Sequence, residues 1–364
     1  MNIINIAVIF GGCSSEYPVS LQSAHAILSN LDRSKYQVYP IGITKEGRWF
    51  HYKGDYDGIL KDIWHEQTEN CIPAILSPDK AHHGILQMQS GKAVIIPVDA
   101  IFPVLHGKNG EDGTMQGLIE LSGIPLIGCG TLSSALCMDK ERAHRLAAAH
   151  GIAVPKAVVL EKGQWEKKQK LRQETEIGAE NYIMNQVEAL GFPLFVKPLR
   201  AGSSFGITKV SKKQQLSASI EQAFQYDSIV IVEENIDGFE VGCAILGNEE
   251  LIVGRVDEIE LSQGFFDYTE KYTLKSSKIH MPARIDEEAE EQIKKTAKTI
   301  YKALGCQGFA RVDMFVTKAG EIVFNEVNTI PGFTSHSRFP NMMKGIGMSF
   351  GEILDKVIEL GVTQ

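Results

Sequence analysis

The 364-residue chain lacks the patterns that would assign it to several common classes. Its six cysteines form no CxxC pair, and no set of cysteine and histidine has the spacing of a zinc site. We therefore expect free thiols, as in a reducing compartment. No apolar run reaches the about 18 residues that a membrane span needs, and the N-terminal "MNIINIAVIFGG" lacks the basic start of a signal peptide. These absences predict a cytoplasmic protein with no membrane partner.

Two phosphate-binding fingerprints are absent as well. No GxGxxG follows the first apolar run, which argues against a dinucleotide-binding dehydrogenase, and no loop ends in the GK[ST] of a Walker A motif. The net charge is −8, from 37 lysines and arginines against 45 aspartates and glutamates, and it is spread along the chain. This balance argues against nucleic acid as the main partner.

What the sequence does contain is an alternation of apolar runs and helix-like segments in its first third. This pattern predicts an α/β fold with an open, largely parallel sheet of the Rossmann-like kind. Beyond it, short apolar runs between tight turns indicate antiparallel strands with helices, as in α+β units. A single core stops growing near roughly 250–300 residues. We therefore expect an N-terminal domain at 1–138, a central unit at 139–235 and a C-terminal unit at 236–364.

A hairpin near the C-terminal end concentrates carboxylate and amide oxygens. Side chains alternate along a strand, so Arg311 and Asp313 share one face of "ARVDMFV". In the same way, Glu326 and Asn328 share one face of "FNEVN". The two strands therefore present the residue types of a cation site, provided that these two faces meet.

The register of this hairpin decides which charges meet. If Thr317 pairs with Ile322 and "KAGE" forms the loop, Asp313 lies opposite Glu326. Opposed carboxylates repel each other across a strand pair, so we expect a cation between them. Mg²⁺ suits this position because it binds oxygen ligands, often one or two carboxylates with phosphate oxygens. The alternative is a solvated face with an ion pair between Arg311 and Asp313.

The stretch "KPLRAGSSFGITKV" places four small residues between two predicted strands. Small residues let backbone N–H groups approach an anion, and Lys197 at the end of the first strand adds a positive charge. The small residues are Gly202, Ser203, Ser204 and Gly206. A phosphate-binding loop and an ordinary hairpin both fit this pattern.

Three further segments carry candidate residues. The stretch "SQGFFDYTEKYTLKSSK" is long for a strand connection, which predicts either a lid at about 262–278 or a mobile surface loop. In the first strand–helix turn, Glu16 suits either a substrate ammonium or the dipole of the helix that begins there. His106 ends another predicted strand, at the edge where open α/β sheets bind ligands.

Seven stretches together resemble the D-alanine-D-alanine ligase family, which has the ATP-grasp fold. They are "GGCSSEYPVSLQSA", "LHGKNGEDGTMQG", "SALCMDK", "FVKPLRAGSSFGITKV", "DYTEKY", "GFARVDMF" and "NEVNTIPGFTSHS". The resemblance implies an enzyme that uses ATP and Mg²⁺, at two sites that Mn²⁺ also suits, to phosphorylate the carboxylate of a first D-alanine. The amine of a second amino acid then attacks this acyl phosphate and forms a dipeptide for peptidoglycan. It also implies a homodimer in the cytoplasm.

The resemblance implies roles for the residues that match the family's substrate site. Glu16 would hold the ammonium of the first D-alanine, with His106 nearby. Ser203 and Tyr272 would join Glu16 in a hydrogen-bonded set that ties the lid to the first domain. Ser337 would meet the carboxylate of the second amino acid.

The resemblance also implies a nucleotide site in the two C-terminal units. Lys140 and Lys197 would contact the phosphates of ATP, and Lys271 would contact the γ-phosphate as it is transferred. Glu233 and Glu240 would bind the adenosine, with Glu240 at the ribose.

In the hairpin, the resemblance implies that Asp313, Glu326 and Asn328 hold Mg²⁺. Arg311 and the backbone N–H of Gly332 would stabilise the oxyanion of the tetrahedral intermediate. Because this set is complete, an enzyme is favoured over a nucleotide-binding regulator that keeps the fold without turnover.

Two positions depart from the family pattern. Residue 234 is Glu where many members carry Lys near the adenine, so the backbone at Glu234 would recognise the base. Arg338 stands where these ligases usually carry an aliphatic residue, and an Arg there is similar to the D-alanine-D-serine ligases of vancomycin-resistant bacteria. The wider stretches "GFFDYTEKYTLKSS" and "FTSHSRFPNMMKGIG" resemble the VanG type in particular. A guanidinium has donors but no acceptors, which favours D-serine as the acceptor. If Arg338 points to solvent or pairs with an acid, a housekeeping D-alanine-D-alanine ligase is the alternative.

Overall fold

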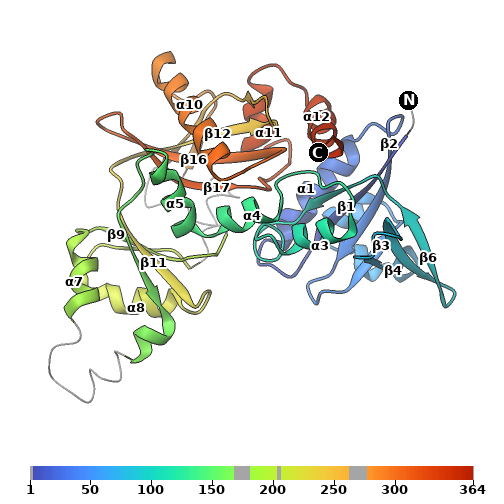
Figure 1. Ribbon diagram of the computed structural model, residues 1–364, viewed down its shortest axis with the longest axis horizontal. Helices are drawn as coiled ribbons and strands as arrows, with labels where there is room; N and C mark the ends of the chain where they lie inside the picture. The colour runs from blue at the N-terminus through green and yellow to red at the C-terminus, as the bar shows by residue number, and fades with distance from the viewer. Residues whose placement is uncertain (1–2, 168–180, 203–205, 262–276, 364) are drawn as a thin grey trace.

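The structure is a computed structural model of the whole chain. It describes residues 3–167, 181–202, 206–261 and 277–363. The predicted contacts Ser203, Lys271 and Tyr272 lie outside the described residues, as does most of the predicted lid. Three sheets form, each from a separate part of the chain, and Figure 1 shows them grouped around α4 (Thr131–Met138).

The first sheet has seven strands in the order β6-β5-β4-β3-β2-β1-β7. They are β1 (Ile4–Gly11), β2 (Tyr36–Ile43), β3 (Trp49–Tyr52), β4 (Cys71–Leu76), β5 (Gly84–Gln89), β6 (Lys92–Pro97) and β7 (Ala100–Val104). The pairs of β1 with β2 and β7 are parallel, as predicted, but β3 to β6 are antiparallel. A parallel pair needs a crossover of about a dozen residues or more, whereas residues 44–48 alone join β2 to β3.

The strand β1 is buried on both faces. Ile6 and Phe10 belong to one core cluster, and Ala7 and Ile9 to another, which explains the continuous apolar run in the sequence. Its buried position fixes the turn that leads into the first helix. The helical segments of this part are α1 (Tyr17–Asn30), α2 (Tyr56–Leu60), the short turns η1 (Trp64–Glu66) and η2 (Thr68–Asn70), α3 (Thr114–Ser122) and α4.

The second sheet is antiparallel, in the order β10-β9-β11-β8. Its elements are α5 (Lys140–Ala149), β8 (Ala157–Glu161), α7 (Asn181–Ala189), β9 (Leu194–Pro198), β10 (Thr208–Val210), α8 (Lys213–Ala223) and β11 (Ile229–Glu234). Leu160, Val196 and Val230 share one face with the core formed by α7 and α8. Lys197 and Glu233 therefore lie on the opposite face, because side chains alternate along a strand.

The third sheet is also antiparallel, in the order β15-β14-β12-β16-β17 with β13 beside β12, as the sequence predicted for this part. Its strands are β12 (Gly238–Leu246), β13 (Ile252–Val253), β14 (Asp257–Leu261), β15 (Ser277–His280), β16 (Phe309–Thr317) and β17 (Ile322–Asn328). The helices are α10 (Glu287–Ala303), α11 (Arg338–Lys344) and α12 (Phe350–Val362).

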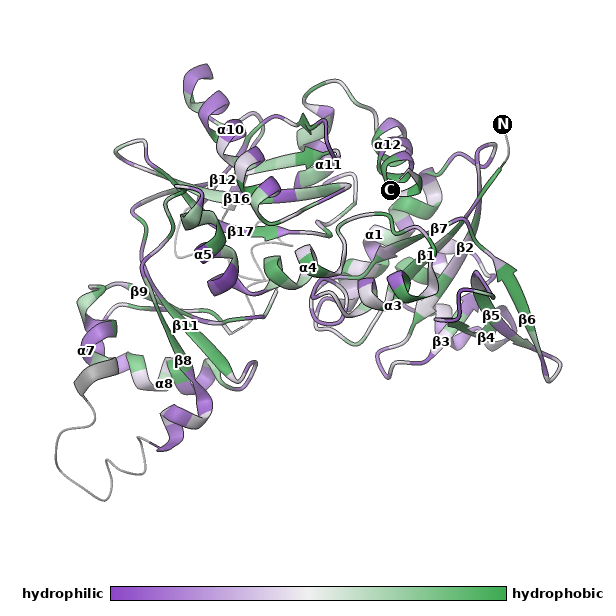
Figure 2. Ribbon diagram, in the orientation of Figure 1, coloured by the Kyte–Doolittle hydropathy of each residue, from purple (hydrophilic) through white to green (hydrophobic). Residues whose placement is uncertain are grey.

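The first and third parts share one hydrophobic core. Phe333, Phe339 and Ile353 of the C-terminal part pack in the same buried cluster as Ile6 and Phe10 of β1. The central sheet has a separate core. Figure 2 shows hydrophobic residues along β1 and β11, and hydrophilic residues on α10. No helix among the described residues is long and apolar enough to cross a membrane.

Candidate active site

The β16–β17 hairpin brings the predicted cation ligands together. Asp313 lies opposite Glu326, and Arg311 opposite Asn328, as the strand alternation predicted. Asp313 is buried, and its carboxylate accepts hydrogen bonds from Arg311 Nε at 2.8 Å and from Asn328 Nδ2 at 2.9 Å. Glu326 Oε2 lies 3.4 Å from Lys140 Nζ. The ion pair that the sequence left as an alternative is therefore present.

The predicted closure of the hairpin is wrong by one residue. Ile322 pairs with Val316 instead of Thr317, so the turn is longer than "KAGE". The backbone N–H of Thr317 donates to the carbonyl of Glu321 at 2.9 Å within this turn. A register shift next to Asp313 absorbs the extra residue, as a β-bulge does, and restores the predicted opposition of the two carboxylates.

The hairpin fits a magnesium ion by the chemistry of its donors. Among the described residues, no group of three or more His, Cys, Asp or Glu is arranged to hold a metal. Asp313, Glu326 and Asn328 supply two carboxylates and one amide from facing strands. This is the small, oxygen-only set that Mg²⁺ uses when phosphates complete its coordination.

A cavity of about 440 Å³ lies between the central and C-terminal sheets. It brings together five residues that the family resemblance assigned to the nucleotide: Lys140, Lys197, Glu233, Glu234 and Glu240. Phe195 and Phe315 add aromatic surface to its wall, and Glu326 connects it to the hairpin. A volume in this range suits a small-molecule ligand with an aromatic base.

Glu233 offers an unused acceptor in the wall of this nucleotide cavity. Its Oε2 accepts from Lys197 Nζ at 2.5 Å, whereas its buried Oε1 has no hydrogen-bond partner among the described residues. Burial raises the pKa of Glu233, but Lys197 and the other basic neighbours together outweigh burial, so the pKa of this carboxyl lies below its usual value. A buried acceptor without a partner is costly, and the amino group of adenine is the kind of donor that would satisfy it.

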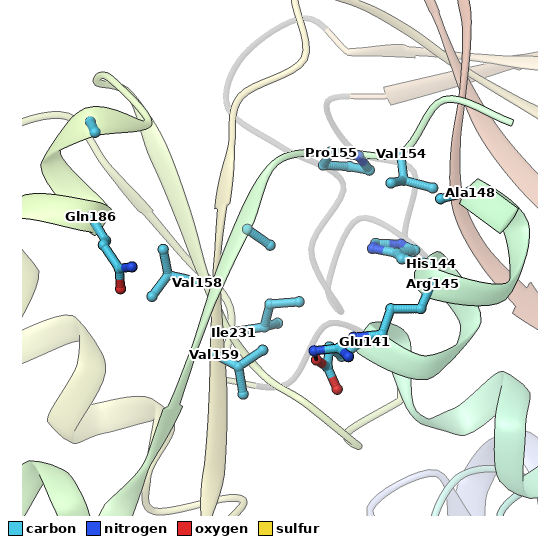
Figure 3. A pocket seen from close by; sticks show the side chains of 12 residues that line it. Glu141, His144, Arg145, Ala148, Val154, Pro155, Val158, Val159, Gln186 and Ile231 are labelled. Atoms are coloured by element: carbon cyan, nitrogen blue, oxygen red, sulfur yellow. Dashed lines mark ion pairs between the residues drawn. The ribbon is translucent and has the colours of Figure 1, made fainter. Parts of the chain in front are cut away.

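His144 on α5 lies close to the carboxylate of Glu233. This residue was not predicted from the sequence. Its Nε2 donates to the backbone carbonyl of Asn325 at 2.7 Å, and its Nδ1 lies 3.9 Å from Glu233 Oε1. Burial lowers the pKa of His144, which favours the neutral ring. Figure 3 shows His144 beside a second cavity of about 640 Å³, between α5 and the strands β8 and β11, which contains none of the predicted site residues.

Glu16 lies where the N-terminal domain meets the glycine-rich loop. It is buried at the start of α1. A Cβ atom at Gly202 would overlap Glu16 Oε1, and one at Gly107 would lie 2.6 Å from it. The loops at Gly107 and Gly202 therefore both approach this carboxylate closely, and a side chain at either position would displace it.

His106 is buried, and both of its ring nitrogens bond to the protein. Nδ1 donates to the carbonyl of Ile330 at 2.8 Å, and Nε2 accepts from Ser23 Oγ at 3.2 Å. Burial lowers the pKa of His106 to about 4, so the ring is neutral near pH 7. The structure thus places His106 next to the loop that carries Gly332.

Ser337 and Gly332 lie close together at the start of α11. Ser337 is the N-cap residue of this helix. The backbone N–H of Thr334 donates to Ser337 Oγ at 2.9 Å, and a Cβ atom at Gly332 would lie 3.1 Å from the same oxygen. The two predicted substrate contacts are therefore neighbours in space.

Arg338 is buried and surrounded by acidic side chains. Its Nε and Nη2 donate to Asp257 at 2.8 and 2.7 Å, and its Nη1 lies 3.2 Å from Glu240 and 3.3 Å from Asp313. Of the two arrangements that the sequence left as alternatives, exposure to solvent is absent and pairing with acids is present. Asp257 was not predicted, because no local pattern marks it among the acids of β14.

The comparisons with known proteins agree with this geometry. The family models for the D-ala D-ala ligase N-terminus and C-terminus match residues 5–129 and 146–359. The crystal structure of VanG D-Ala:D-Ser ligase from Enterococcus faecalis is 61% identical, covers 99% of each chain and has a TM-score of 0.88.

Two curated relatives match over similar lengths. Vancomycin B-type resistance protein VanB of Enterococcus faecalis is 45% identical over 100% of this chain and 99% of its own length. The D-alanine–D-alanine ligase of Caldicellulosiruptor bescii is 43% identical over 100% and 96%. The resemblance drawn from the seven sequence stretches is confirmed: the chain belongs to the D-alanine-D-alanine ligase family of ATP-grasp enzymes.

Proposed function

We propose that this chain joins D-alanine to D-serine with ATP, through a D-alanyl phosphate intermediate. Family membership gives the reaction class, an ATP-dependent ligase, and the acceptor is what the proposal adds. The observation that carries it is the buried guanidinium of Arg338, held by Asp257 one residue beyond Ser337. The relative at 61% identity is described as a D-Ala:D-Ser ligase, which supports the same acceptor.

The first step activates a carboxylate, which is a poor electrophile at neutral pH. The carboxylate oxygen of D-alanine attacks the γ-phosphorus, the bond from that phosphorus to the bridging oxygen breaks, and ADP leaves. Glu16 would hold the ammonium of D-alanine, and Lys140 and Lys197 would hold the phosphates where they line the nucleotide cavity. Positioning and charge neutralisation supply most of the catalysis in such a transfer.

The second step forms the peptide bond. The neutral amine of the acceptor attacks the acyl carbon, a C–N bond forms, the C–O bond to phosphate breaks, inorganic phosphate leaves and the nitrogen gives up a proton. Arg311 and the Gly332 N–H would stabilise the oxyanion of the tetrahedral intermediate. Asp313, Glu326 and Asn328 would hold Mg²⁺, which supplies neutralisation of phosphate charge.

Arg338 would select the acceptor through its Nη1. Asp257 holds Nε and Nη2 and so fixes the plane of the guanidinium. A serine hydroxyl accepts a hydrogen bond from Nη1, whereas the methyl group of alanine does not. A hydrogen bond to a charged group contributes roughly 1.5–3 kcal/mol, or about 10- to 150-fold in selectivity.

A D-alanine-D-alanine ligase is the second candidate, and one observation favours it. The donors of Arg338 already face carboxylates of Asp257, Glu240 and Asp313, so no donor has to wait for a hydroxyl. The penalty against D-alanine is then smaller than an unpaired donor would impose. Among the curated relatives, the ligase from Caldicellulosiruptor bescii carries this activity in its name.

The test measures phosphate release from ATP and Mg²⁺ with D-alanine alone and with D-alanine plus D-serine. We expect release that depends on D-alanine and rises when D-serine is added, with D-alanyl-D-serine as the product. Absence of amino-acid-dependent phosphate release would exclude a ligase, and ATP binding without phosphate release would favour a nucleotide-binding regulator. Release that D-serine does not raise would point to the second candidate.

The proposal also gives the product a biological setting. D-alanyl-D-serine would enter altered peptidoglycan precursors, as expected of a vancomycin-resistance enzyme, and the relatives VanG and VanB support this setting. A cytoplasmic homodimer stays a prediction from the family resemblance. Light scattering of the purified chain would test the dimer, since a monomer at micromolar concentration would contradict it.

A further inference from the structure

The loop that carries Gly332 is held by the N-terminal domain. Ile330 is fixed at both of its backbone groups, because its N–H donates to Glu111 Oε1 at 3.0 Å and its carbonyl accepts from His106 Nδ1 at 2.8 Å. Three residues further, the N–H of Phe333 donates to Ser23 Oγ at 3.1 Å. All three holding side chains come from the N-terminal domain, and all three bonds span more than 200 positions of the sequence.

Glu111 has a specific place among these three holding side chains. Its second oxygen, Oε2, accepts from the backbone N–H of Gly107 at 2.8 Å. The carboxyl group of Glu111 thus connects two loops. One follows β7 and lies next to Glu16, and the other follows β17. Burial and the neighbouring Glu16 raise the pKa of Glu111 to about 8, whereas its two backbone N–H donors, from Gly107 and Ile330, favour the charged form.

Gly332 lies between the two points at which its loop is held. Among the described residues, no hydrogen bond uses its backbone N–H. The Gly332 N–H is therefore available, and the chain is held on both sides of it. An oxyanion site requires such a donor, because the donor does not have to move when negative charge develops. The fixing bonds come from a domain that also supplies Glu16, so the acyl group and the oxyanion donor would be placed by the same rigid body.

We propose that Glu111 is a positioning residue for the acyl-transfer step, which acts by holding the Ile330 N–H and so aiming the Gly332 N–H at the developing oxyanion. This inference rests on the proposed function. Glu111 touches neither the nucleotide cavity nor the β16–β17 ligands through any hydrogen bond of the described residues. Its loss should therefore affect the second chemical step far more than the first.

The variant Glu111→Gln separates the two steps. Glutamine keeps the shape but has one acceptor oxygen for two backbone N–H groups, so one of them loses its partner. Loss of a single oxyanion donor costs about 100- to 1000-fold in kcat in other enzymes, so misplacing one should slow dipeptide formation about tenfold or more. The KM for ATP should stay within about twofold of wild type, because Glu111 does not line the nucleotide cavity.

The decisive readout is positional isotope exchange in ATP labelled with ¹⁸O at the β–γ bridge, measured with D-alanine. The exchange reports reversible formation of the acyl phosphate, whereas product analysis reports its consumption. We expect Glu111→Gln to raise the ratio of exchange to dipeptide formation about tenfold or more, because the intermediate forms normally and reverts. Wild-type enzyme without any D-alanine-dependent exchange or dipeptide would instead overturn the proposed function.

Two further variants keep the test sharp. Asp112→Asn is the matched control. Asp112 accepts hydrogen bonds from the backbone N–H groups of Asn109 and Thr114 in the same loop, and it makes no hydrogen bond to residues 330–333 among the described residues. The exchange ratio of this variant should equal that of wild type. Ser23→Ala removes the hold on Phe333 and should raise the ratio in the same direction, which decides the matter if Glu111→Gln does not fold. An unchanged ratio in the folded variants, or an equal rise in Asp112→Asn, would overturn the positioning role.

Discussion

Arg338 is marked by its position in the sequence, but the residues that surround it become visible only in the structure. The sequence predicts a guanidinium at the second substrate, and the structure adds Asp257, Glu240 and Asp313 around it. Because Asp257 fixes one edge of the guanidinium, selection would depend on Nη1 alone.

The substitution Arg338→Leu should shift the acceptor preference toward D-alanine by about 10- to 150-fold. It also leaves Asp257 buried without its partner, which should cost about 3–5 kcal/mol of stability. The ratio of the two dipeptides from a mixture of both acceptors is the right measurement, because it does not depend on the folded fraction. Arg255→Leu, at a partly exposed ion pair with Glu290, serves as control. An unchanged ratio would remove Arg338 as the selector.

Asp313→Asn tests the predicted metal site. The substitution keeps the shape, but it removes the charge that faces Arg311 and, by proposal, Mg²⁺. We expect the Mg²⁺ concentration for half-maximal turnover to rise at least about tenfold, as a lost ligand charge implies. A magnesium titration of phosphate release measures this, and normal turnover at wild-type Mg²⁺ would contradict the hairpin site.

His106 should make the fold sensitive to acid. Burial lowers its pKa from 6.5 to about 4, so between these values the unfolded chain binds a proton that the folded chain refuses. Stability therefore falls as pH falls through this window, by about 2 kcal/mol between pH 7 and pH 5. Urea unfolding at the two pH values measures the loss. His106→Gln should reduce the pH dependence, and a variant with the wild-type dependence would show that other groups cause it.

At the scale of elements, the β16–β17 hairpin shows that a sequence pattern can predict which side chains face each other but not the length of the turn. Alternation predicted that Asp313 faces Glu326, and it does. The predicted length of the hairpin loop was wrong. The turn is one residue longer, and a bulge beside Asp313 shifts the register back by one residue, so the two effects cancel at Asp313. Neither feature can be recognised in the hydrophobic pattern. The same limit applies to the first sheet, where the sequence pattern predicts largely parallel pairing and β3 to β6 pair antiparallel.

Long-range contacts set the other limit of the sequence prediction. Asp257, Glu111 and His144 bond to partners 81, 219 and 181 positions away, and no local spacing marks them. The family motifs point to their residues from sequence alone, and five of the residues predicted for the nucleotide line one cavity. The supporting residues become visible only when the elements are assembled.

The strand β12 should tolerate only glycine at position 242. A Cβ atom there would overlap Arg338 Nη2 and lie 2.7 Å from Asp257 Oδ1. Gly242→Ala should therefore displace the guanidinium and lower the share of D-alanyl-D-serine among the products, without changing the charge of any residue. Gly351→Ala in α12, where a Cβ meets open space, is the control and should leave the products unchanged. A wild-type product ratio for Gly242→Ala would show that the packing of Arg338 on β12 does not matter.

At the scale of the whole molecule, the core that joins the N-terminal and C-terminal parts is separate from the core of the central sheet. The N-terminal and C-terminal parts share a core and hold Glu16, His106 and the Gly332 loop in one body. The central sheet has its own core and forms the opposite wall of the nucleotide cavity. A nucleotide bound in this cavity therefore bridges two separately stabilised bodies.

This arrangement predicts that ATP with Mg²⁺ stabilises the chain. A ligand at 100 times its Kd adds about 2.7 kcal/mol to the free energy of unfolding. Thermal unfolding with and without the nucleotide measures this, with GTP as the comparison, because guanine offers a carbonyl where Glu233 Oε1 needs a donor. Equal stabilisation by GTP would contradict the assignment of Glu233 to the adenine.

The acceptor is the central claim, and one competition experiment tests it most directly. Wild-type enzyme with ATP, Mg²⁺, D-alanine and an equal concentration of D-serine at physiological pH is analysed for its dipeptides by mass spectrometry. The account predicts that D-alanyl-D-serine dominates, because Arg338 can donate to its hydroxyl. Dominant D-alanyl-D-alanine under the same conditions would contradict it and identify the chain as a D-alanine-D-alanine ligase.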